Sequence, residues 1–202
     1  MKLHGHRMAT NPRRIGIYLA EKGLKIEQVE VDTAAGAHKR PEFLAMNPAG
    51  QIPVLELDDG TYLPESAAIV EYLEELYPDP PMIGVTPGTR AKARALERIG
   101  NDLIVRAGLM LMHSHVHFAG RVEQKPAVAD AVRPLVNELL ATLEQHIGDK
   151  PFLTGERPSI ADCTLFALFQ TCRIRLNLPF GAEYSRLDAW YTRFAKRPSA
   201  AY

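Results

Sequence analysis

The chain has 202 residues, enough for one large domain or two small ones. Its 24 basic residues balance 24 acidic ones, and 46% of all residues are hydrophobic, which is an ordinary globular composition. A net charge of zero argues against a nucleic-acid-binding protein, because no excess of positive charge is available to displace counterions from phosphates. The absence of a long apolar stretch, the lack of a secretory signal and the two cysteines predict a cytoplasmic location, with no membrane or nucleic-acid partner.

A segment rich in proline and glycine, residues 78–88, divides the chain. Its four prolines are incompatible with a regular helix or a central strand. We therefore predict a first domain over residues 1–77, a linker over 78–88 and a second domain over 89–202. The first 77 residues carry 8 basic and 12 acidic residues and the remainder 16 and 12, so the two parts have net charges of about −4 and +4.

The first domain alternates strands and helices. Asn11 or Thr10 can cap a first helix that runs from Pro12 and ends at Gly23, and Asp59-Gly60 between two apolar runs predicts a hairpin. The hydrophobic periodicity predicts strands over Lys2–His6, Ile26–Asp32, Ile52–Leu57 and Thr61–Leu63, and further helices over Pro41–Asn47 and Glu65–Leu76. The order β-α-β-α-β-β-α requires both a parallel and an antiparallel pair, so an α/β domain with a mixed sheet is expected.

The second domain contains only helical periodicity. Apolar residues recur at helical spacing over Thr89–Phe118, Ala127–Ile147, Ser159–Leu176 and Ala182–Lys196, which predicts an all-α bundle. Ser159 and Asp162 have the spacing of a capping box before an apolar run. We therefore interpret Asp162 as closing the start of a helix and not as a catalytic acid.

Two groups of side chains suggest other chemistry. Within the predicted helix, only His113 and His117 of the HSHVH run share a face, and no third ligand stands at metal spacing, so no metal is expected. We interpret these histidines, His115 included, as polar walls of the cleft between the domains. Cys163 and Cys172 lie nine residues apart in one predicted helix and are interpreted as core residues, which excludes thiol–disulfide exchange by the chain's own cysteines.

The chain resembles the cytosolic glutathione S-transferase family, in its bacterial-type branch. The resemblance is carried by NPRRIGIYLAEKG, by HKRPEFLAMNPAGQIPVLELDDGTYLPESAAIVEYLEELYP and by PSIADCTLFA. It implies a thioredoxin-like N-terminal domain that binds glutathione, an all-α C-terminal domain that binds the electrophile, and a homodimer.

The resemblance also assigns residues to glutathione. It implies a cis peptide before Pro53, so that the backbone of Ile52 pairs with the cysteinyl part of the ligand as an added strand would; the alternative is a simple proline at a strand end. Glu65 and Ser66 would hold the ammonium and carboxylate of the γ-glutamyl group at a helix start. Ser66 can serve as an ordinary helix cap at the same time.

The glycyl carboxylate of glutathione is assigned to a loop and its surroundings. The resemblance places His38, and with it Lys39 and Gln51, near this group. The alternative for His38 and Lys39 is a solvated polar pair.

The chain departs from the family at the catalytic position. The register that usually carries a serine or cysteine falls on Ala9, which has no donor, whereas the adjacent Thr10 has a hydroxyl. Lowering a thiol pKa from about 8.5 by one to two units corresponds to about 1.4 to 2.7 kcal/mol. One hydrogen bond to a charged group supplies about 1.5 to 3 kcal/mol, and a helix N-terminus about 0.3 to 1 more. Thr10 is therefore the candidate activating residue, and the alternative is that it only caps the helix.

These observations predict a glutathione transferase that joins the glutathione thiolate to small, mostly apolar electrophiles. Its electrophile site is expected at Leu109, Met112, His113 and Phe118. Two alternatives stay open: a glutathione-binding protein with little turnover, which the alanine at position 9 permits, and a glutathione-dependent isomerase or reductase.

Overall fold

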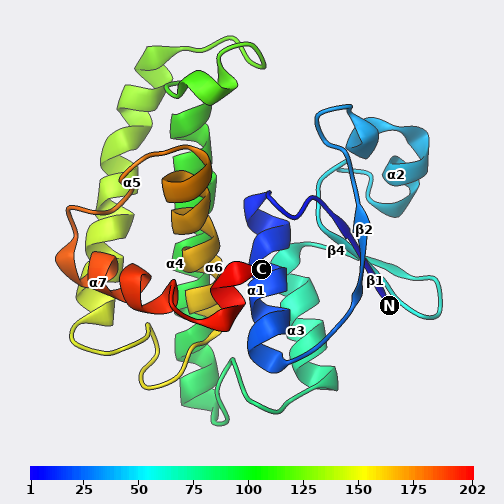
Figure 1. Cartoon of the computed structure of the whole chain (residues 1–202), viewed down its shortest axis with the longest axis horizontal. Helices are drawn as coiled ribbons and strands as arrows, with labels where there is room; N and C mark the ends of the chain where they lie inside the picture. Colours follow the sequence, from blue (N-terminus) through cyan, green and yellow to red (C-terminus); the bar gives the residue numbers. More distant parts are fainter. The chain divides into compact units, whose positions relative to one another are not determined.

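A computed structural model describes all residues, 1–202. The chain forms two compact units, one made of Met1–Met82 together with Arg197–Tyr202 and the other of Ile83–Lys196. Figure 1 follows the chain through them in colour, from blue at the N-terminus to red at the C-terminus. None of the helices combines the length and the apolarity that crossing a membrane requires.

The first unit is built on a four-stranded mixed sheet. Its strands are β1 (Lys2–Gly5), β2 (Glu27–Glu30), β3 (Val54–Glu56) and β4 (Tyr62–Pro64), in the order β2-β1-β3-β4. β1 pairs parallel with β2 and antiparallel with β3, and β3 pairs antiparallel with β4. Gly60 of the predicted hairpin has φ +85°, a conformation that glycine adopts without steric cost. The predicted mixed sheet is confirmed, although β1, β2 and β3 are shorter than predicted and β4 begins one residue later than predicted.

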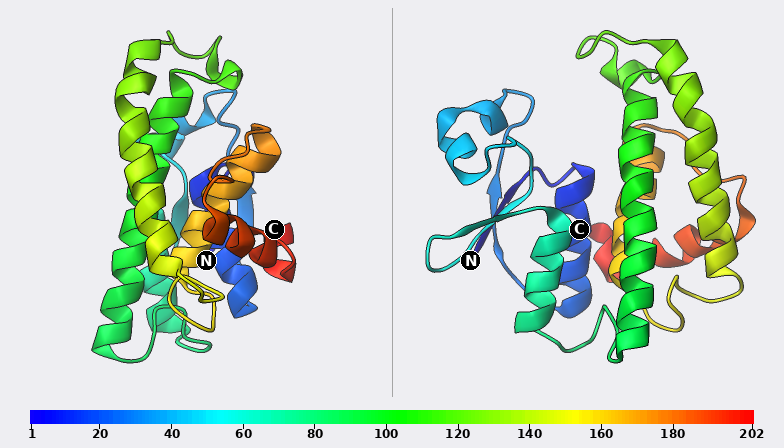
Figure 2. Two further views of the ribbon diagram at one scale, coloured as in Figure 1. Left: turned by 90° about the vertical axis from the view of Figure 1, so that its left-hand side faces the viewer. Right: turned by 180° about the vertical axis from the view of Figure 1, so that it is seen from behind.

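Helices cover both faces of this sheet. α1 (Thr10–Lys22) and α3 (Ser66–Leu76) lie side by side on one face, and the short α2 (Pro41–Met46) lies on the other (Figures 1 and 2). A 3-10 turn, η1 (Ala37–Lys39), leads into α2, whose Phe43 packs with Val31 and Val54. The arrangement is the thioredoxin-like βαβαββα fold that the resemblance implied.

A buried ion pair fixes α1 against α3. The ammonium of Lys22 lies 2.7 Å from Glu74 Oε1, and both side chains are almost fully buried. The hydroxyl of Tyr18 donates to the same carboxylate oxygen at 2.8 Å, while the N–H of Met82 donates to the other at 3.1 Å. Lys22 also donates to the carbonyl of Pro80. Because each of these groups has a hydrogen-bond partner, the ion pair links α1 and α3 to residues 80–82, which follow α3.

The second unit is all helical. Two long helices, α4 (Pro87–Met112) and α5 (Pro126–Ile147), lie side by side, with α6 (Ile160–Gln170) against α4 and α7 (Ser185–Phe194) against α5 (Figure 2). The predicted capping box is confirmed at the start of α6, where Ser159 and Asp162 bond each other's backbone. α6 continues into a π-helical turn, Thr171–Arg175.

The predicted helix to Phe118 was too long. α4 ends at Met112, and a separate 3-10 turn, η2 (Val116–Phe118), follows it. The N–H of His117 donates to Nδ1 of His115 at 3.2 Å, which closes this turn. The apolar spacing continues past Met112, but this side-chain bond supports a turn where the periodicity predicted helix.

The C-terminal residues return to the first unit, which the sequence pattern did not indicate. Arg197 makes two hydrogen bonds to Glu21 of α1, at 2.6 and 2.7 Å, and a 3-10 turn, η4 (Pro198–Ala201), follows. The ring of Tyr202 lies over Gly16, where a Cβ would come within 1.6 Å of it. Only glycine at this position of α1 leaves room for the C-terminal segment.

Candidate functional site

Three segments of the first unit meet where the sequence placed the glutathione residues. An added Cβ on Gly5, at the end of β1, would lie 3.0 Å from Cβ of Pro12 and 3.7 Å from Cβ of Pro53. Arg14 of α1 donates a hydrogen bond to the hydroxyl of Ser66 at the start of α3. The N-terminus of α1, the Ile52–Pro53 segment and the N-terminus of α3 are therefore brought together by the fold.

The Ile52–Pro53 segment precedes β3. Its peptide bond is cis, as the resemblance implied. The N–H and C=O of Ile52 make no backbone hydrogen bond within the chain, because the pairing of β3 with β1 begins at Val54. An extended peptide lying here would find one unpaired donor and one unpaired acceptor, which is the requirement for strand addition.

The N-terminus of α3 is open. No side chain accepts a hydrogen bond from the backbone of its first turn, and the N–H groups of residues 66–68 have no acceptor in the chain. Glu65, which precedes the helix, adopts φ +69° and ψ 111°, a strained conformation for a residue with a side chain. Ser66 is only 3% exposed. Unpaired N–H groups, a hydroxyl and the helix dipole together form a binding site for a carboxylate.

Another helix of this chain shows how such a start is filled. At α7, the N–H groups of Arg186 and Leu187 donate to the two carboxylate oxygens of Glu144, at 3.0 and 2.9 Å. Here a carboxylate from a neighbouring helix satisfies the first turn. α3 has no such carboxylate in the chain, so the corresponding position is available to a ligand.

Thr10 is the first residue of α1 and not its cap. Ala9 occupies the N-cap position with extended backbone angles and makes no side-chain bond, so the expectation that Asn11 or Thr10 caps the helix was wrong. The cap lies one residue earlier than the polar pattern indicated, because the carbonyl of Ala9 accepts the first helical bond, from Arg13. Thr10 is half-buried in the first turn. This position places its hydroxyl at the positive end of the helix dipole.

The three residues assigned to the glycyl carboxylate differ in their surroundings. Nδ1 of His38 is buried without a hydrogen-bond partner, whereas Gln51 is exposed. The ammonium of Lys39 donates to the carbonyls of Ala49 and Gly50, at 3.2 and 2.9 Å. Two of its three N–H groups thus hold the loop before Gln51 in place, a structural task that the sequence did not reveal.

The residues expected at the electrophile site lie at and beyond the end of α4. Leu109 and Met112 are exposed to 38% and 37%, while His113 and Phe118 are half-buried. Because α4 stops at Met112, His113 and His117 do not share a helix face as predicted. Burial, together with the charges of Arg175, Arg121 and His115, lowers the pKa of His117. No three His, Cys, Asp or Glu side chains form a cluster that could hold a metal ion.

Both cysteines are buried in the second unit and unbridged. Burial raises the pKa of the Cys172 thiol to about 12. A thiol in this environment stays protonated at neutral pH and is a poor nucleophile. The interpretation of the cysteines as core residues agrees with the burial of both.

Arg14 is a residue of the site that the sequence did not single out. Its side chain is buried, and it supplies the contact between α1 and Ser66 across 52 positions of sequence. The only available signal was a charged residue within the apolar stripe of α1, which is unusual for a helix packed on a sheet.

Fold and candidate site together define a thioredoxin-like domain with an open helix start, joined to a helical domain. Residues 1–75 match the family description "Glutathione S-transferase, N-terminal domain", and residues 101–198 match "Glutathione S-transferase, C-terminal domain". The chain belongs to the glutathione S-transferase family, whose members bind glutathione and are typically dimeric.

Individual relatives extend along nearly the whole chain. A maleylacetoacetate isomerase of Pseudomonas aeruginosa is 35% identical over 193 residues, covering 94% of this chain and 86% of the relative. Glutathione S-transferase 2 of Saccharomyces cerevisiae is 32% identical and covers 93% and 82%. The crystal structure of Gtt2 from the same yeast has a TM-score of 0.87 at 29% identity, covering 100% of this chain and 99% of that one.

Proposed function

We propose that this protein is a glutathione transferase, which binds glutathione in the first unit and transfers its thiolate to a small electrophile. The observation that carries the proposal is the start of α3, where strained Glu65 precedes three N–H groups without acceptors and a buried serine hydroxyl. The γ-glutamyl group of glutathione carries a carboxylate and an ammonium on one carbon. The helix start and Ser66 suit the carboxylate, and Glu65 suits the ammonium.

The other two residues of glutathione would contact the segments next to the start of α3. The unpaired backbone groups of Ile52 suit the cysteinyl residue. His38, with its unpartnered Nδ1, suits the glycyl carboxylate, assisted by Gln51 and the remaining N–H of Lys39. In this arrangement, the thiol lies toward the N-terminus of α1.

Thr10 would then stabilise the thiolate. Its hydroxyl donates to sulfur at the positive end of the α1 dipole, and no general base is needed because the thiol loses its proton to water. The thiolate then attacks the electrophilic carbon and forms the C–S bond as the leaving group departs with its electron pair. Leu109, Met112, His113 and Phe118 are the proposed contacts of the electrophile.

Isomerisation is the second candidate, and the 35% identity to a maleylacetoacetate isomerase favours it. The same thiolate would add to a double bond conjugated with a carbonyl, the resulting single bond would rotate, and expulsion of the thiolate would restore glutathione. Both reactions require the activated thiol and differ in the electrophile. We further propose that the protein acts as a cytoplasmic homodimer, which a sedimentation experiment showing only the 22.5 kDa species would contradict.

Parallel rate measurements test these activities. The purified chain with glutathione is given an activated aryl halide in one assay and maleylacetoacetate in the other, and each uncatalysed rate is subtracted. Conjugation of the halide without isomerisation supports the transferase, and isomerisation alone supports the second candidate. Binding of glutathione with neither reaction would contradict both and identify a binding protein.

A further inference from the structure

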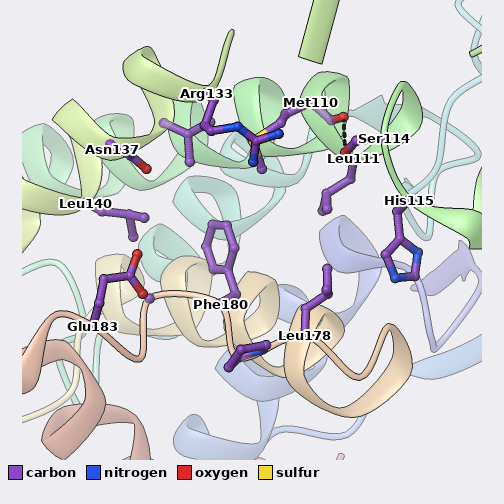
Figure 3. A pocket seen from close by; sticks show the side chains of 13 residues that line it. Met110, Leu111, Ser114, His115, Arg133, Asn137, Leu140, Leu178, Phe180 and Glu183 are labelled. Carbon is purple, nitrogen blue, oxygen red and sulfur yellow. Dashed lines mark hydrogen bonds between the residues drawn. The ribbon is translucent and has the colours of Figure 1, made fainter. Parts of the chain in front are cut away.

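Basic side chains are arranged differently in the two units. The helical unit contains a pocket of about 420 Å³, in which Arg133 and His115 lie on different sides and cannot share one ligand group (Figure 3). In the first unit, by contrast, Arg7 and Arg13 both donate to the backbone of the C-terminal segment, Arg197–Tyr202. These two arginines lie on either side of Thr10 in the sequence, which is the residue proposed to activate the thiol.

The C-terminal segment is anchored along α1. Besides the bonds of Arg197 to Glu21 near the end of the helix, the ring of Tyr202 lies against Gly16. The hydroxyl of Tyr202 also donates to Oε1 of Gln28 at 2.8 Å. The backbone around Tyr202 is therefore fixed both to α1 and to β2.

Arg13 joins this anchored backbone to the turn before α1. Its side chain is only 8% exposed. One terminal nitrogen donates to the carbonyl oxygen of Tyr202 at 2.8 Å, and the other lies 3.4 Å from the sulfur of Met8. A single buried guanidinium thus connects the C-terminal segment to a residue that precedes Thr10 by two positions.

Arg7 makes a second link from the same turn. Its guanidinium donates to the carbonyl of Ala201 at 3.2 Å. It also lies 5.1 Å from the centre of the Tyr202 ring, within the distance of a cation–π attraction. The turn before α1 is therefore tied to the C-terminal segment at more than one point.

The turn that carries Thr10 lacks a side-chain cap of its own. Ala9 occupies the N-cap of α1 without a side-chain hydrogen bond, whereas at α4 the hydroxyl of Thr86 accepts from the N–H of Thr89 at 3.2 Å. A cap of this kind fixes how the chain enters its helix. At α1, the contacts of the two arginines with the C-terminal segment take over this task.

The direction of the Thr10 hydroxyl follows from the backbone of this turn, because only one rotatable bond separates the two and branching at Cβ makes it stiff. A hydrogen bond weakens steeply as its angle departs from linear, and a displacement of about 1 Å can cost about a hundredfold in rate. We propose that Arg13 and Tyr202 are positioning residues, which hold the turn so that the hydroxyl of Thr10 is directed at the glutathione sulfur. This inference rests on the proposed function.

The test follows the thiolate absorbance of bound glutathione against pH in the full chain. In Arg13→Met and in Tyr202→Ala, we expect the thiol to ionise about one pH unit higher than in the parent, which is a tenfold change in its acid constant. Adding either substitution to Thr10→Val should cause no further rise, because both act through the same hydroxyl. The affinity for glutathione at about pH 5.5, where the thiol is protonated in every variant, should stay unchanged.

Lys25→Met is the matched control. Lys25 is an exposed cation of the same unit and follows Gly23, at the opposite end of α1 from Thr10, so its loss should leave the thiol pKa unchanged. Circular dichroism shows which variants fold, and Tyr202→Ala keeps the test decisive if Arg13→Met does not, since it leaves Arg13 in place.

Two results would overturn this inference alone. The first is a thiol that ionises as in the parent in both Arg13→Met and Tyr202→Ala, although Thr10→Val raises its pKa. The second is a double variant that titrates well above Thr10→Val, since Arg13 would then act through its charge. A parent that does not bind glutathione, or a Thr10→Val variant that titrates like the parent, would instead contradict the proposed function, and this inference with it.

Discussion

Helices α3 and α6 each contain 11 residues, but their N-termini are completed in opposite ways. At α6, Ser159 and Asp162 satisfy the first turn from within the chain. At α3, a strained Glu65 precedes N–H groups that no side chain satisfies. A helix start closed by its own side chains serves the fold, and one left open at an energetic cost is available to a ligand.

At the start of α6, the carboxylate of Asp162 also accepts hydrogen bonds from residues outside that helix. One carboxylate oxygen of Asp162 accepts from the N–H of Leu153 and from the indole of Trp190, both at 2.9 Å. The other accepts from the N–H and hydroxyl of Ser159, at 2.9 and 2.8 Å. Full burial raises the pKa of this carboxyl, although all four donors oppose the rise. Asp162 therefore joins α6 to α7 and to the preceding loop.

Replacing Asp162 should produce the largest effect of any single substitution at these two helix starts. Asp162→Ala leaves several buried donors without an acceptor, so we expect a loss of about 3 to 5 kcal/mol in the free energy of unfolding. Urea denaturation measures it. Any folded fraction should bind glutathione with unchanged affinity, and a weaker affinity in that fraction would break the assignment of this helix start to the fold.

At the open start, Ser66→Ala should act mainly on the ligand. Loss of the hydroxyl should weaken glutathione binding about tenfold, while the free energy of unfolding falls by about 1 kcal/mol because Arg14 loses an acceptor. Titration calorimetry measures the affinity. Ser185→Ala is the matched control, since Ser185 is the first residue of α7 as Ser66 is of α3. Unchanged affinity in Ser66→Ala would remove this hydroxyl from the site.

Glu65→Gly separates strain from binding. Glycine adopts positive φ without steric cost, so the variant should be more stable by up to about 1 kcal/mol. It should nevertheless bind glutathione more weakly, because the carboxylate proposed for the ammonium is gone. Thermal unfolding and calorimetry measure the two changes. A variant that is both less stable and unchanged in affinity would show that Glu65 serves the fold, as Asp162 does.

The contact of Glu21 with Arg197 and Ser199 should make the stability of the first unit depend on pH. Burial favours the protonated form, but hydrogen bonds from Arg197 and Ser199 outweigh it and lower the pKa of Glu21 below its ordinary 4.5. The ionised carboxylate therefore stabilises the fold above pH 4.5, and this stabilisation is lost as the pH falls through the lowered pKa.

The parent should accordingly be more stable than Glu21→Gln at pH 7, and this difference in the free energy of unfolding should vanish in acid. Urea denaturation at a series of pH values measures it, with exposed Glu27→Gln as the control. A stability difference independent of pH would show that the contact does not act through the charge of Glu21.

Local signals made much of the fold predictable. Asp59-Gly60 indicated the hairpin and Ser159 with Asp162 the start of α6, because in each case the interacting residues lie within a few positions of each other. The end of α4 was not predictable, since apolar spacing continues beyond Met112 while a side-chain bond of His115 stabilises a turn. The contact of Arg197 with Glu21 joins residues 176 positions apart and has no local signal.

Of the candidate site, too, the sequence predicted the residues that belong to local motifs and missed the contacts that depend on tertiary structure. Ile52, Pro53, Glu65 and Ser66 stood out because they belong to motifs carried by neighbouring residues. The contact from Arg14 to Ser66, the use of Lys39 by two carbonyls and the cap at Ala9 emerged only from the structure. Each depends on backbone geometry or on tertiary packing, which periodicity does not encode.

We expect the open site to activate the glutathione thiol through the hydroxyl of Thr10. Thiolate absorbance of bound glutathione, followed against pH, tests it most directly in the parent, in Thr10→Val and in the control Thr61→Val. The parent and the control should titrate one to two pH units below the about 8.5 of a free thiol, and Thr10→Val should titrate close to it. A bound thiol that ionises at the same pH in Thr10→Val as in the parent would contradict the claim.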